Sequence, residues 1–357
     1  MKFENKKKVV VAMSGGVDSS VAAALLKQQG YDVIGVFMQF WYPSGNNYSE
    51  NRCCSLESYQ EAHTVATTLG IPLYKVNFGR QFKKIIVDEF LKEHKIGYTP
   101  NPCVACNKFI KFNLLLNYAR TVFGADYLAT GHYVKLIHNK SGYQLLRPKD
   151  KAKDQTYFLY NLKQEQLKHL LFPLADYKKE QVRELAKKLK LNIYNKPDSQ
   201  EICFVGNSRE YFLKRYLKLK IGKIVDVNGK ILGEHQGLPL YTIGQRSRLG
   251  LSGGPWYVVK MDLKNNRLIV TKNPQDKLLK KHEIFFDKVN WLNNYLIKLP
   301  LKCTAQIRYR GIAKPCQVEK IGRKYKAVFK QPQQAIAAGQ SIVFYDKDKL
   351  LGGGIIV

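Results

Sequence analysis

The chain has 357 residues, 45% of them hydrophobic. Because a chain of this length usually folds around more than one hydrophobic core, two or three domains are expected. Its 59 lysines and arginines outnumber 28 aspartates and glutamates, and the net charge of +31 favours a polyanionic partner, nucleic acid, over a merely solvated basic surface. No apolar run approaches the ~20 residues of a membrane span, and seven unevenly spaced cysteines suit a reducing compartment, so a cytoplasmic protein without a membrane partner is expected.

Strand-like and helix-like segments alternate over residues 1–205. The expected strands are Val9–Met13, Val33–Met38, Leu73–Val76 and Tyr127–Thr130. The expected helices are Ser19–Gln29, Leu56–Leu69, Lys108–Phe123 and Tyr177–Leu189. Such alternation predicts βαβ units, and therefore an α/β domain with a Rossmann-like, doubly wound parallel sheet.

After Gly206 the pattern changes to that of β-hairpins. Asn228-Gly229 lies between two β-type arms, which is the strongest short hairpin signal, and Asn265-Asn266 repeats the arrangement. From Lys281 onward, the segments read as an antiparallel sheet or small barrel. We therefore predict a small central domain over residues 206–280 and a C-terminal antiparallel β-barrel over residues 281–357.

The segment SGGVDSS (14–20) follows the first expected strand and opens the first expected helix. Glycines let the backbone approach a phosphate closely, and the N–H groups of a helix start point toward it. Neither GxxxxGK[ST] nor GxGxxG is present. The segment resembles the pyrophosphate loop of the adenine nucleotide α-hydrolase superfamily, which includes GMP synthetase, argininosuccinate synthetase and tRNA thiolases. This resemblance implies that ATP is split between its α and β phosphates and that a substrate oxygen is adenylated, so that it can leave. A plain glycine turn is the alternative.

Two cysteines precede and begin the expected helix Lys108–Phe123, in TPNPCVACNKFIKF (99–112). A thiol at a helix N-terminus, close to lysines, should have a lowered pKa. The buried stripe of this helix is expected to be Phe109, Phe112, Leu115 and Ala119. A zinc half-site, a redox CxxC pair and a buried structural thiol are alternatives, although zinc usually requires a second pair, and only Cys53-Cys54 offers one.

Further motifs follow in order: ATGHY (129–133), KDQTYFLY (153–160), DSQEICFVG (198–206), YTIGQR (241–246) and AQIRYR (305–310). Together with TPNP…CNKFIKF they resemble the tRNA-specific 2-thiouridylases over nearly the whole chain. The resemblance implies a tRNA-uridine 2-sulfurtransferase that uses ATP with Mg²⁺ and acts on the wobble uridine, position 34, of tRNA. It also implies a cysteine desulfurase or sulfur-relay protein as persulfide donor, and a monomer is expected.

The resemblance assigns roles by position. Cys203 is similar to the residue that receives sulfur as a persulfide, and Cys106 to the nucleophile that liberates this sulfur and becomes disulfide-bonded to Cys203. The residues expected to bind ATP are Ala12, Met13, Ser14, Gly15, Gly16, Val17, Asp18, Ser19, Met38 and Gly131. Those expected around the target base are Asn101, Pro102 and Cys103. Those expected to contact tRNA are His132, Lys153, Asp154, Gln155, Arg308, Tyr309 and Gln340.

Several alternatives stay open. Cys103 stands where the family usually has Asp, and a [4Fe–4S] cluster held by Cys103, Cys106 and Cys203 is a second sulfur route. Met38 also reads as a strand core residue, and His132 as a buried, hydrogen-bonded histidine. An adenylating transferase with an amine nucleophile, and a nucleotide-gated RNA-binding protein with zinc, are the rival functions. The remaining cysteines, expected to be structural, are Cys53, Cys54, Cys303 and Cys316.

Overall fold

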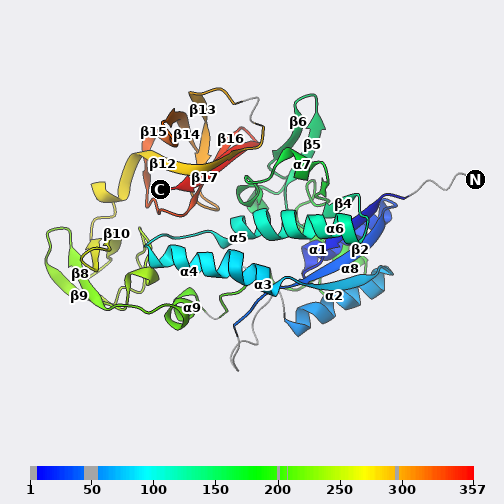
Figure 1. Ribbon diagram of the computed structural model, residues 1–357, viewed down its shortest axis with the longest axis horizontal. Helices are drawn as coiled ribbons and strands as arrows, with labels where there is room; N and C mark the ends of the chain where they lie inside the picture. The colour runs from blue at the N-terminus through cyan, green and yellow to red at the C-terminus, as the bar shows by residue number, and fades with distance from the viewer. Residues whose placement is uncertain (1–5, 44–54, 199–201, 207, 294–296) are drawn as a thin grey trace, which may run out of the picture. The chain divides into compact units, whose positions relative to one another are not determined.

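The computed structural model describes residues 6–43, 55–198, 202–206, 208–293 and 297–357. The chain forms two compact units (Figure 1). Unit 1 consists of Met1–Val87, Cys103–Gly206 and Asp348–Leu351. Unit 2 consists of Asp88–Pro102, Asn207–Lys347 and Gly352–Val357. The division into three domains at residues 205 and 280 stays a prediction.

Unit 1 is built on a parallel sheet with the strand order β3-β2-β1-β4-β7. The strands are β1 (Lys8–Ala12), β2 (Asp32–Gln39), β3 (Leu73–Asn77), β4 (Tyr127–Ala129) and β7 (Leu170–Leu171). The central strand β1 pairs with β2 on one side and β4 on the other: Val9 lies opposite both Val33 and Tyr127. The predicted Rossmann-like, doubly wound sheet is confirmed.

Helices cover this sheet, and their apolar faces form the core of unit 1. The longer helices are α1 (Val17–Gln28), α2 (Leu56–Leu69) and α8 (Lys179–Lys188), and the shorter ones are α3 (Gly79–Phe82), η1 (Lys83–Val87), η3 (Lys151–Lys153), η4 (Thr156–Phe158) and α7 (Gln164–Leu167). The core joins β1 and β2 to α1, α2 and α8 through buried Val11, Phe37, Leu26, Val65 and Val182. A hairpin, β5 (Lys135–Asn139) and β6 (Gly142–Leu146), completes the unit.

The helix expected at Lys108–Phe123 begins earlier than predicted, and part of it is not α-helical. It begins at Pro102 as α5 (Pro102–Ala105), continues as a π-helix, η2 (Cys106–Leu115), and ends as α6 (Leu116–Val122). A π-helix has a wider turn than an α-helix, so the side chains that face the core shift. Phe112 is fully buried as predicted, but Phe109 is 38% exposed, so its assignment to the buried stripe was wrong.

Unit 2 contains a small sheet with the order β10-β11-β8-β9 and the two predicted hairpins. Its strands are β8 (Gly222–Asp226), β9 (Ile231–His235), β10 (Tyr257–Asp262) and β11 (Arg267–Thr271), and its helices are α4 (Asp88–Lys95), α9 (Arg209–Tyr216), η5 (Leu238–Leu240) and η6 (Lys277–Leu279). The turns contain Gly229 with φ of 88° and Asn266 with φ of 48°, conformations that Gly and Asn adopt most readily.

A closed antiparallel barrel forms the rest of unit 2, in the order β12-β15-β14-β13-β16-β17, with β17 paired back onto β12. The strands are β12 (Lys280–Trp291), β13 (Leu301–Gln306), β14 (Lys314–Ile321), β15 (Lys324–Gln334), β16 (Ser341–Asp346) and β17 (Lys349–Ile356). Phe286 and Phe344 meet in its interior with ring centroids 5.1 Å apart. The predicted C-terminal β-barrel is confirmed.

Candidate active site

The glycine-rich loop lies between β1 and α1, where the neighbours of β1 change from β2 to β4. In open α/β sheets, ligands bind at the carboxyl edge of the strands at such a switch point. Gly15 has a φ of 71°, and a Cβ there would lie 2.3 Å from the carbonyl oxygen of Ser58. Gly16 is the N-cap of α1 and has no side chain to offer the first N–H groups of the helix. These features fit a loop that binds an anion.

Gly131, which follows β4, packs directly on this loop. A Cβ at Gly131 would lie 2.7 Å from both the Asp18 carbonyl carbon and the Ser19 nitrogen, so only glycine allows the approach. Inside the loop, the Ser14 N–H donates to Ser19 Oγ at 3.2 Å. The structure thus brings the predicted residues 12–19 together with Gly131. Met38 is buried near the end of β2, as a core residue would be, and its contact with adenosine stays a prediction.

Two lysines that the sequence did not single out approach the loop. Lys179 Nζ lies 2.7 and 2.8 Å from the two carboxylate oxygens of Asp18, and its side chain is only 8% exposed. Lys196 Nζ donates to the Gly15 carbonyl at 3.2 Å and also pairs with Glu61. For Lys179 the sequence offered only the basic character of the expected helix Tyr177–Leu189, which does not tell which lysine faces the loop, and Lys196 lies outside that helix.

Tyr133 also contacts Asp18, since its hydroxyl donates to Asp18 Oδ1 at 2.8 Å. Burial, followed by the negative charge of Asp18, raises the pKa of Tyr133 above its ordinary range. The phenol therefore stays protonated and acts as a hydrogen-bond donor that fixes the carboxylate.

Asp198 is the meeting point of three basic side chains. It accepts from Lys153 Nζ at 2.7 Å, Lys179 Nζ at 2.8 Å and Arg183 at 3.0 Å. Burial alone would raise the pKa of Asp198, but the hydrogen bonds and charges of Lys153 and Lys179 outweigh it and lower the pKa to about 2. Asp198 is therefore ionised at neutral pH.

The three cysteines of the predicted sulfur chemistry all belong to unit 1. Cys106 is buried at the start of η2, one turn inside the helix, so the predicted position at the helix N-terminus was wrong for this thiol. The N-terminal position belongs to exposed Cys103, the second residue of α5. Asn101 directly precedes the helix and Pro102 begins it. Cys203 is half-buried in the turn Cys203–Gly206.

Within the described ranges, no three His, Cys, Asp or Glu side chains converge as metal ligands. This finding gives no support to the [4Fe–4S] alternative at Cys103, Cys106 and Cys203. The pair Cys303 and Cys316 faces across β13 and β14 with sulfurs 3.8 Å apart, which suits structural thiols. Cys53 and Cys54 lie outside the described residues.

The four predicted tRNA contacts of unit 1 have partners within the unit. His132 is 9% exposed, and its Nδ1 lies 2.7 Å from the hydroxyl oxygen of Thr130. Burial, with the charge of Lys111, lowers the pKa of His132 well below its ordinary value. Lys153 pairs with Asp198, Asp154 with Arg147, and Gln155 accepts from the Tyr133 N–H at 2.9 Å. These contacts favour the structural reading of His132, and the tRNA contacts stay predictions.

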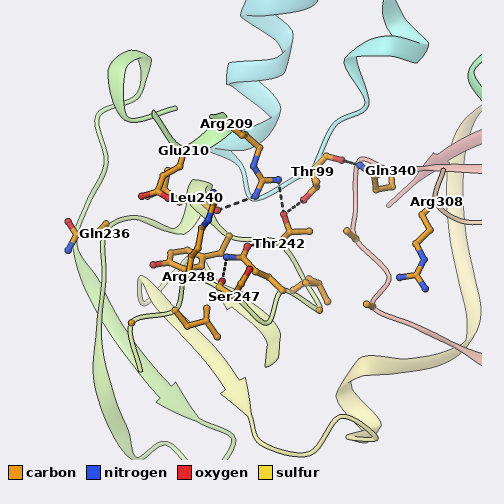
Figure 2. A pocket seen from close by; sticks show the side chains of 18 of the residues that line it. Thr99, Arg209, Glu210, Gln236, Leu240, Thr242, Ser247, Arg248, Arg308 and Gln340 are labelled. Carbon is orange, nitrogen blue, oxygen red and sulfur yellow. Dashed lines mark hydrogen bonds between the residues drawn. The ribbon is translucent and has the colours of Figure 1, made fainter. Parts of the chain in front are cut away.

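Unit 2 contains a pocket of about 740 Å³, shown in Figure 2. The predicted tRNA contacts Arg308 and Gln340 line it, together with Thr99, Arg209 and Arg248. Gln340 Nε2 donates to the Thr99 carbonyl at 2.6 Å, and the Thr99 hydroxyl to Thr242 at 3.3 Å. Arg209 donates to Thr242 Oγ1 at 3.2 Å. A hydrogen-bonded chain thus joins the segment before α5 to the barrel and the small sheet.

The pocket is basic on more than one side. Burial, followed by the like charge of Arg248, lowers the pKa of Arg209. The two guanidinium groups are therefore close enough for electrostatic repulsion. Arg248 holds a left-handed backbone with φ of 62°. Arg308, labelled in Figure 2, lines the pocket from the segment that follows β13. Tyr309 is the next residue in the chain, and the Arg310 guanidinium lies over its ring, 5.4 Å from the ring centroid. Charged and aromatic groups of this kind are typical of RNA-binding surfaces.

Three family models match consecutive parts of the chain. They are described as “tRNA methyl transferase HUP domain” for residues 7–207, “tRNA methyl transferase PRC-barrel domain” for residues 210–272 and “Aminomethyltransferase beta-barrel domain” for residues 281–356. No helix in the described part of the chain has the length and apolar character needed to cross a bilayer.

Curated relatives match over the full length. The “tRNA-specific 2-thiouridylase MnmA” of Carboxydothermus hydrogenoformans is 48% identical over 98% of both chains. That of Clostridioides difficile is 47% identical over 99% of both chains. The Streptococcus mutans relative of the same name is 44% identical and covers all of this chain and 96% of its own.

Proposed function

The chain belongs to the family of tRNA-specific 2-thiouridylases, and from this premise we propose that it is a tRNA-uridine 2-sulfurtransferase that converts the wobble uridine, position 34, to 2-thiouridine. The observation that carries the proposal is the match at 44–48% identity over the whole length of curated relatives with that activity in their name. The “methyl transferase” description of the first family model names a different reaction. Paired cysteines and a pyrophosphate-type loop suit sulfur transfer better than methyl transfer.

ATP is expected to bind with Mg²⁺ at the loop between β1 and α1. The positive φ of Gly15, the uncapped helix start at Gly16 and the close approach of Gly131 leave backbone N–H groups facing the space where phosphates would lie. Lys179 and Lys196 add the positive charge that the loop itself lacks. Splitting ATP between its α and β phosphates adenylates the C2 oxygen of the uridine, which turns that oxygen into a leaving group.

Sulfur replaces this oxygen through the two cysteines. A persulfide donor, a cysteine desulfurase or a sulfur-relay protein, passes sulfane sulfur to Cys203, which becomes Cys203–S–SH. The Cys106 thiolate attacks the inner sulfur, the S–S bond to the outer sulfur breaks, and hydrosulfide leaves while a Cys106–Cys203 disulfide forms. Hydrosulfide attacks C2 and AMP leaves with the former C2 oxygen. A thiol reductant then restores both cysteines.

The tRNA is proposed to lie against the pocket of unit 2 with Arg308, Tyr309 and Gln340, and its target base near Asn101, Pro102 and Cys103. The basic side chains of the pocket, Arg209, Arg248 and Arg308, support this placement because they offer positive charge to phosphates. We also propose that the protein acts as a monomer in the cytoplasm.

Replacing either cysteine tests the sulfur path. Cys106→Ser and Cys203→Ser should each abolish 2-thiouridine formation, measured by nucleoside mass spectrometry of in vitro reacted tRNA, while ATP binding stays intact. Cys316→Ser, at a buried thiol of the barrel, is the matched control and should keep the wild-type rate. Wild-type thiolation by either of the first two variants would show that the assigned sulfur path is wrong.

A further inference from the structure

Asn107 is a buried amide that directly follows Cys106 in the π-helix η2. Its side chain is 3% exposed, and its Nδ2 donates to the Phe158 carbonyl oxygen at 3.3 Å. Its Oδ1 is buried and accepts no hydrogen bond within the described part of the chain. A buried acceptor without a partner costs free energy, so an apolar side chain of similar size would serve the packing equally well. The choice of asparagine therefore calls for a reason other than stability.

The acceptor of this amide is connected to the nucleotide loop by hydrogen bonds. The Phe158 N–H donates to the Gln155 carbonyl at 3.0 Å, which closes the short helix η4. Gln155 is joined to Tyr133 twice, since its Oε1 accepts from the Tyr133 N–H at 2.9 Å and its own N–H donates to the Tyr133 carbonyl at 3.1 Å. The Tyr133 hydroxyl in turn donates to Asp18 Oδ1 in the loop at 2.8 Å. A line of direct contacts thus runs from the loop to Asn107.

A second side-chain amide attaches the same π-helix farther along. Gln166 Nε2, from α7, donates to the Phe112 carbonyl oxygen at 2.5 Å. Segments of π-helix are rare and occur frequently at functional sites. Because the winding of a helix decides where its side chains point, contacts that hold η2 in its surroundings also hold the direction of the Cys106 side chain.

We propose that Asn107 is a positioning residue for the sulfur step, and that its bond to Phe158 fixes the Cys106 thiol relative to the nucleotide loop. The inference rests on the proposed function, in which Cys106 attacks the persulfide and the loop binds ATP. Attack on an S–S bond requires the thiolate to be aligned with it, and the released hydrosulfide must meet a uridine that is adenylated at the loop. A line of hydrogen bonds from the loop to the residue beside Cys106 provides this registration.

Asn107→Leu tests the inference, because leucine has a similar size and lacks the amide donor. With a cysteine desulfurase as persulfide donor, kcat for 2-thiouridine formation should fall about tenfold to a hundredfold, as a slightly misplaced reacting group predicts. The KM values for ATP and tRNA should stay as in the wild type. The thermal midpoint should also stay close to that of the wild type, because the lost hydrogen bond is offset by removal of the unpaired Oδ1. If Asn107→Leu does not fold, Asn107→Ala takes its place.

Sodium sulfide separates positioning of the thiol from general damage. Added hydrosulfide reaches the adenylated uridine without the help of either cysteine, so Asn107→Leu and Cys106→Ser should both form 2-thiouridine at the rate of the wild type with the same sulfide. A residue that only supports the fold or the loop would leave its variant slow with sulfide as well. Asn113→Leu makes the same substitution at an exposed position of η2 and should keep the wild-type rate with both sulfur sources.

Cys106→Ser distinguishes the possible failures. If this variant keeps its activity with the persulfide donor, or if sulfide does not restore it, the proposed sulfur path is wrong and this inference falls with it. If Cys106→Ser behaves as proposed, a wild-type kcat of Asn107→Leu with the persulfide donor overturns the inference alone. An Asn107→Leu variant that stays slow with sulfide overturns it too, because the defect then lies in adenylation or in folding.

Discussion

At the scale of single residues, Gly15 is the glycine of the loop at which a side chain is tolerated least. Its φ of 71° is unfavourable for any residue with a Cβ, and that Cβ would lie 2.3 Å from the Ser58 carbonyl oxygen. Gly15→Ala should therefore lower the free energy of unfolding by about 2 kcal/mol or more, since both the strain and a displaced backbone act against it. Urea unfolding measures the stability, and equilibrium dialysis should show weakened ATP binding.

Gly30, just after α1, is the matched control for Gly15. Its φ is 87°, but a Cβ there would meet nothing within 4 Å, so Gly30→Ala carries only the backbone penalty, about 1 kcal/mol. ATP binding by Gly30→Ala should be unchanged. Equal losses of stability in the two variants would mean that the approach to Ser58 is not what requires glycine.

Single residues also show where prediction from sequence ends. The loop residues were found because glycines and a strand-to-helix transition are local signals, and Gly131 came from the resemblance. Lys179 and Lys196 were missed, because Lys179 is 161 residues away from Asp18 and only the packing of α8 against α1 selects it. No local pattern distinguishes this lysine from its exposed neighbours.

At the scale of elements, the helix from Pro102 to Val122 offers two phenylalanines with opposite surroundings. Phe112 is fully buried between His132 and Phe172, whereas Phe109 is 38% exposed. Phe112→Ala should lower the free energy of unfolding by about 3–5 kcal/mol, and Phe109→Ala by clearly less, about 1 kcal/mol. Urea unfolding of both variants measures the difference.

This pair of variants also tests the winding of η2. With the 3.6-residue period of a regular α-helix, residues 109 and 112 share a face, which is why both were expected to be buried. Similar losses of stability would restore that α-helical register. The sequence carries no local signal for a π-helix, because its wider turn follows from how the segment packs on the sheet and not from the preferences of its residues.

Helix α4 carries a histidine that should make stability depend on pH. Burial, followed by the charge of Arg209, lowers the pKa of His94 from 6.5 to about 3. As the pH falls, His94 is therefore protonated in the unfolded chain before it is protonated in the folded chain. The free energy of unfolding is highest above pH 6.5 and decreases progressively from about pH 6.5 toward 3. The slope is about 1.4 kcal/mol per pH unit for one such group.

His94→Leu removes this group and should reduce the dependence on pH. Between pH 7 and about pH 5, urea unfolding of His94→Leu should lose about 2 kcal/mol less than the wild type loses. His63→Leu, at an exposed position of α2, should leave the loss as it is in the wild type. An unchanged loss in His94→Leu would mean that His94 is protonated equally in the folded and unfolded chain.

At the scale of the whole molecule, the fold classes followed from patterns of short range. Alternating strands and helices predicted the doubly wound sheet, and Asn-Gly and Asn-Asn turns predicted the hairpins of the small sheet. Neither the alternation of strands and helices nor the turn signals showed that residues 88–102 belong with residues 207–347 in unit 2. That association depends on contacts such as the Thr99 N–H donating to the Ala338 carbonyl at 2.8 Å, and contacts over such separations leave no periodic trace in a single sequence.

The net charge of +31 makes the affinity for tRNA a property of the whole molecule. Each phosphate neutralised by a lysine or arginine releases counterions, so the affinity falls as salt rises. With 6–10 phosphate contacts, the affinity should fall about 10³-fold or more between about 50 and 200 mM salt. Fluorescence anisotropy with labelled tRNA measures it, and an affinity that barely changes with salt would contradict a phosphate-dominated interface.

Arg308 makes this prediction specific to the pocket of unit 2. If its guanidinium contacts one phosphate, Arg308→Ala should lower the slope of log Kd against log salt by about 1, while Arg308→Lys keeps the charge and nearly the full slope. ATP binding should be unchanged in both variants, because Arg308 belongs to unit 2 and the nucleotide loop to unit 1. A full slope in Arg308→Ala would place Arg308 outside the tRNA interface, and a reduced slope in Arg308→Lys would show that the planar guanidinium, and not the charge alone, makes the contact.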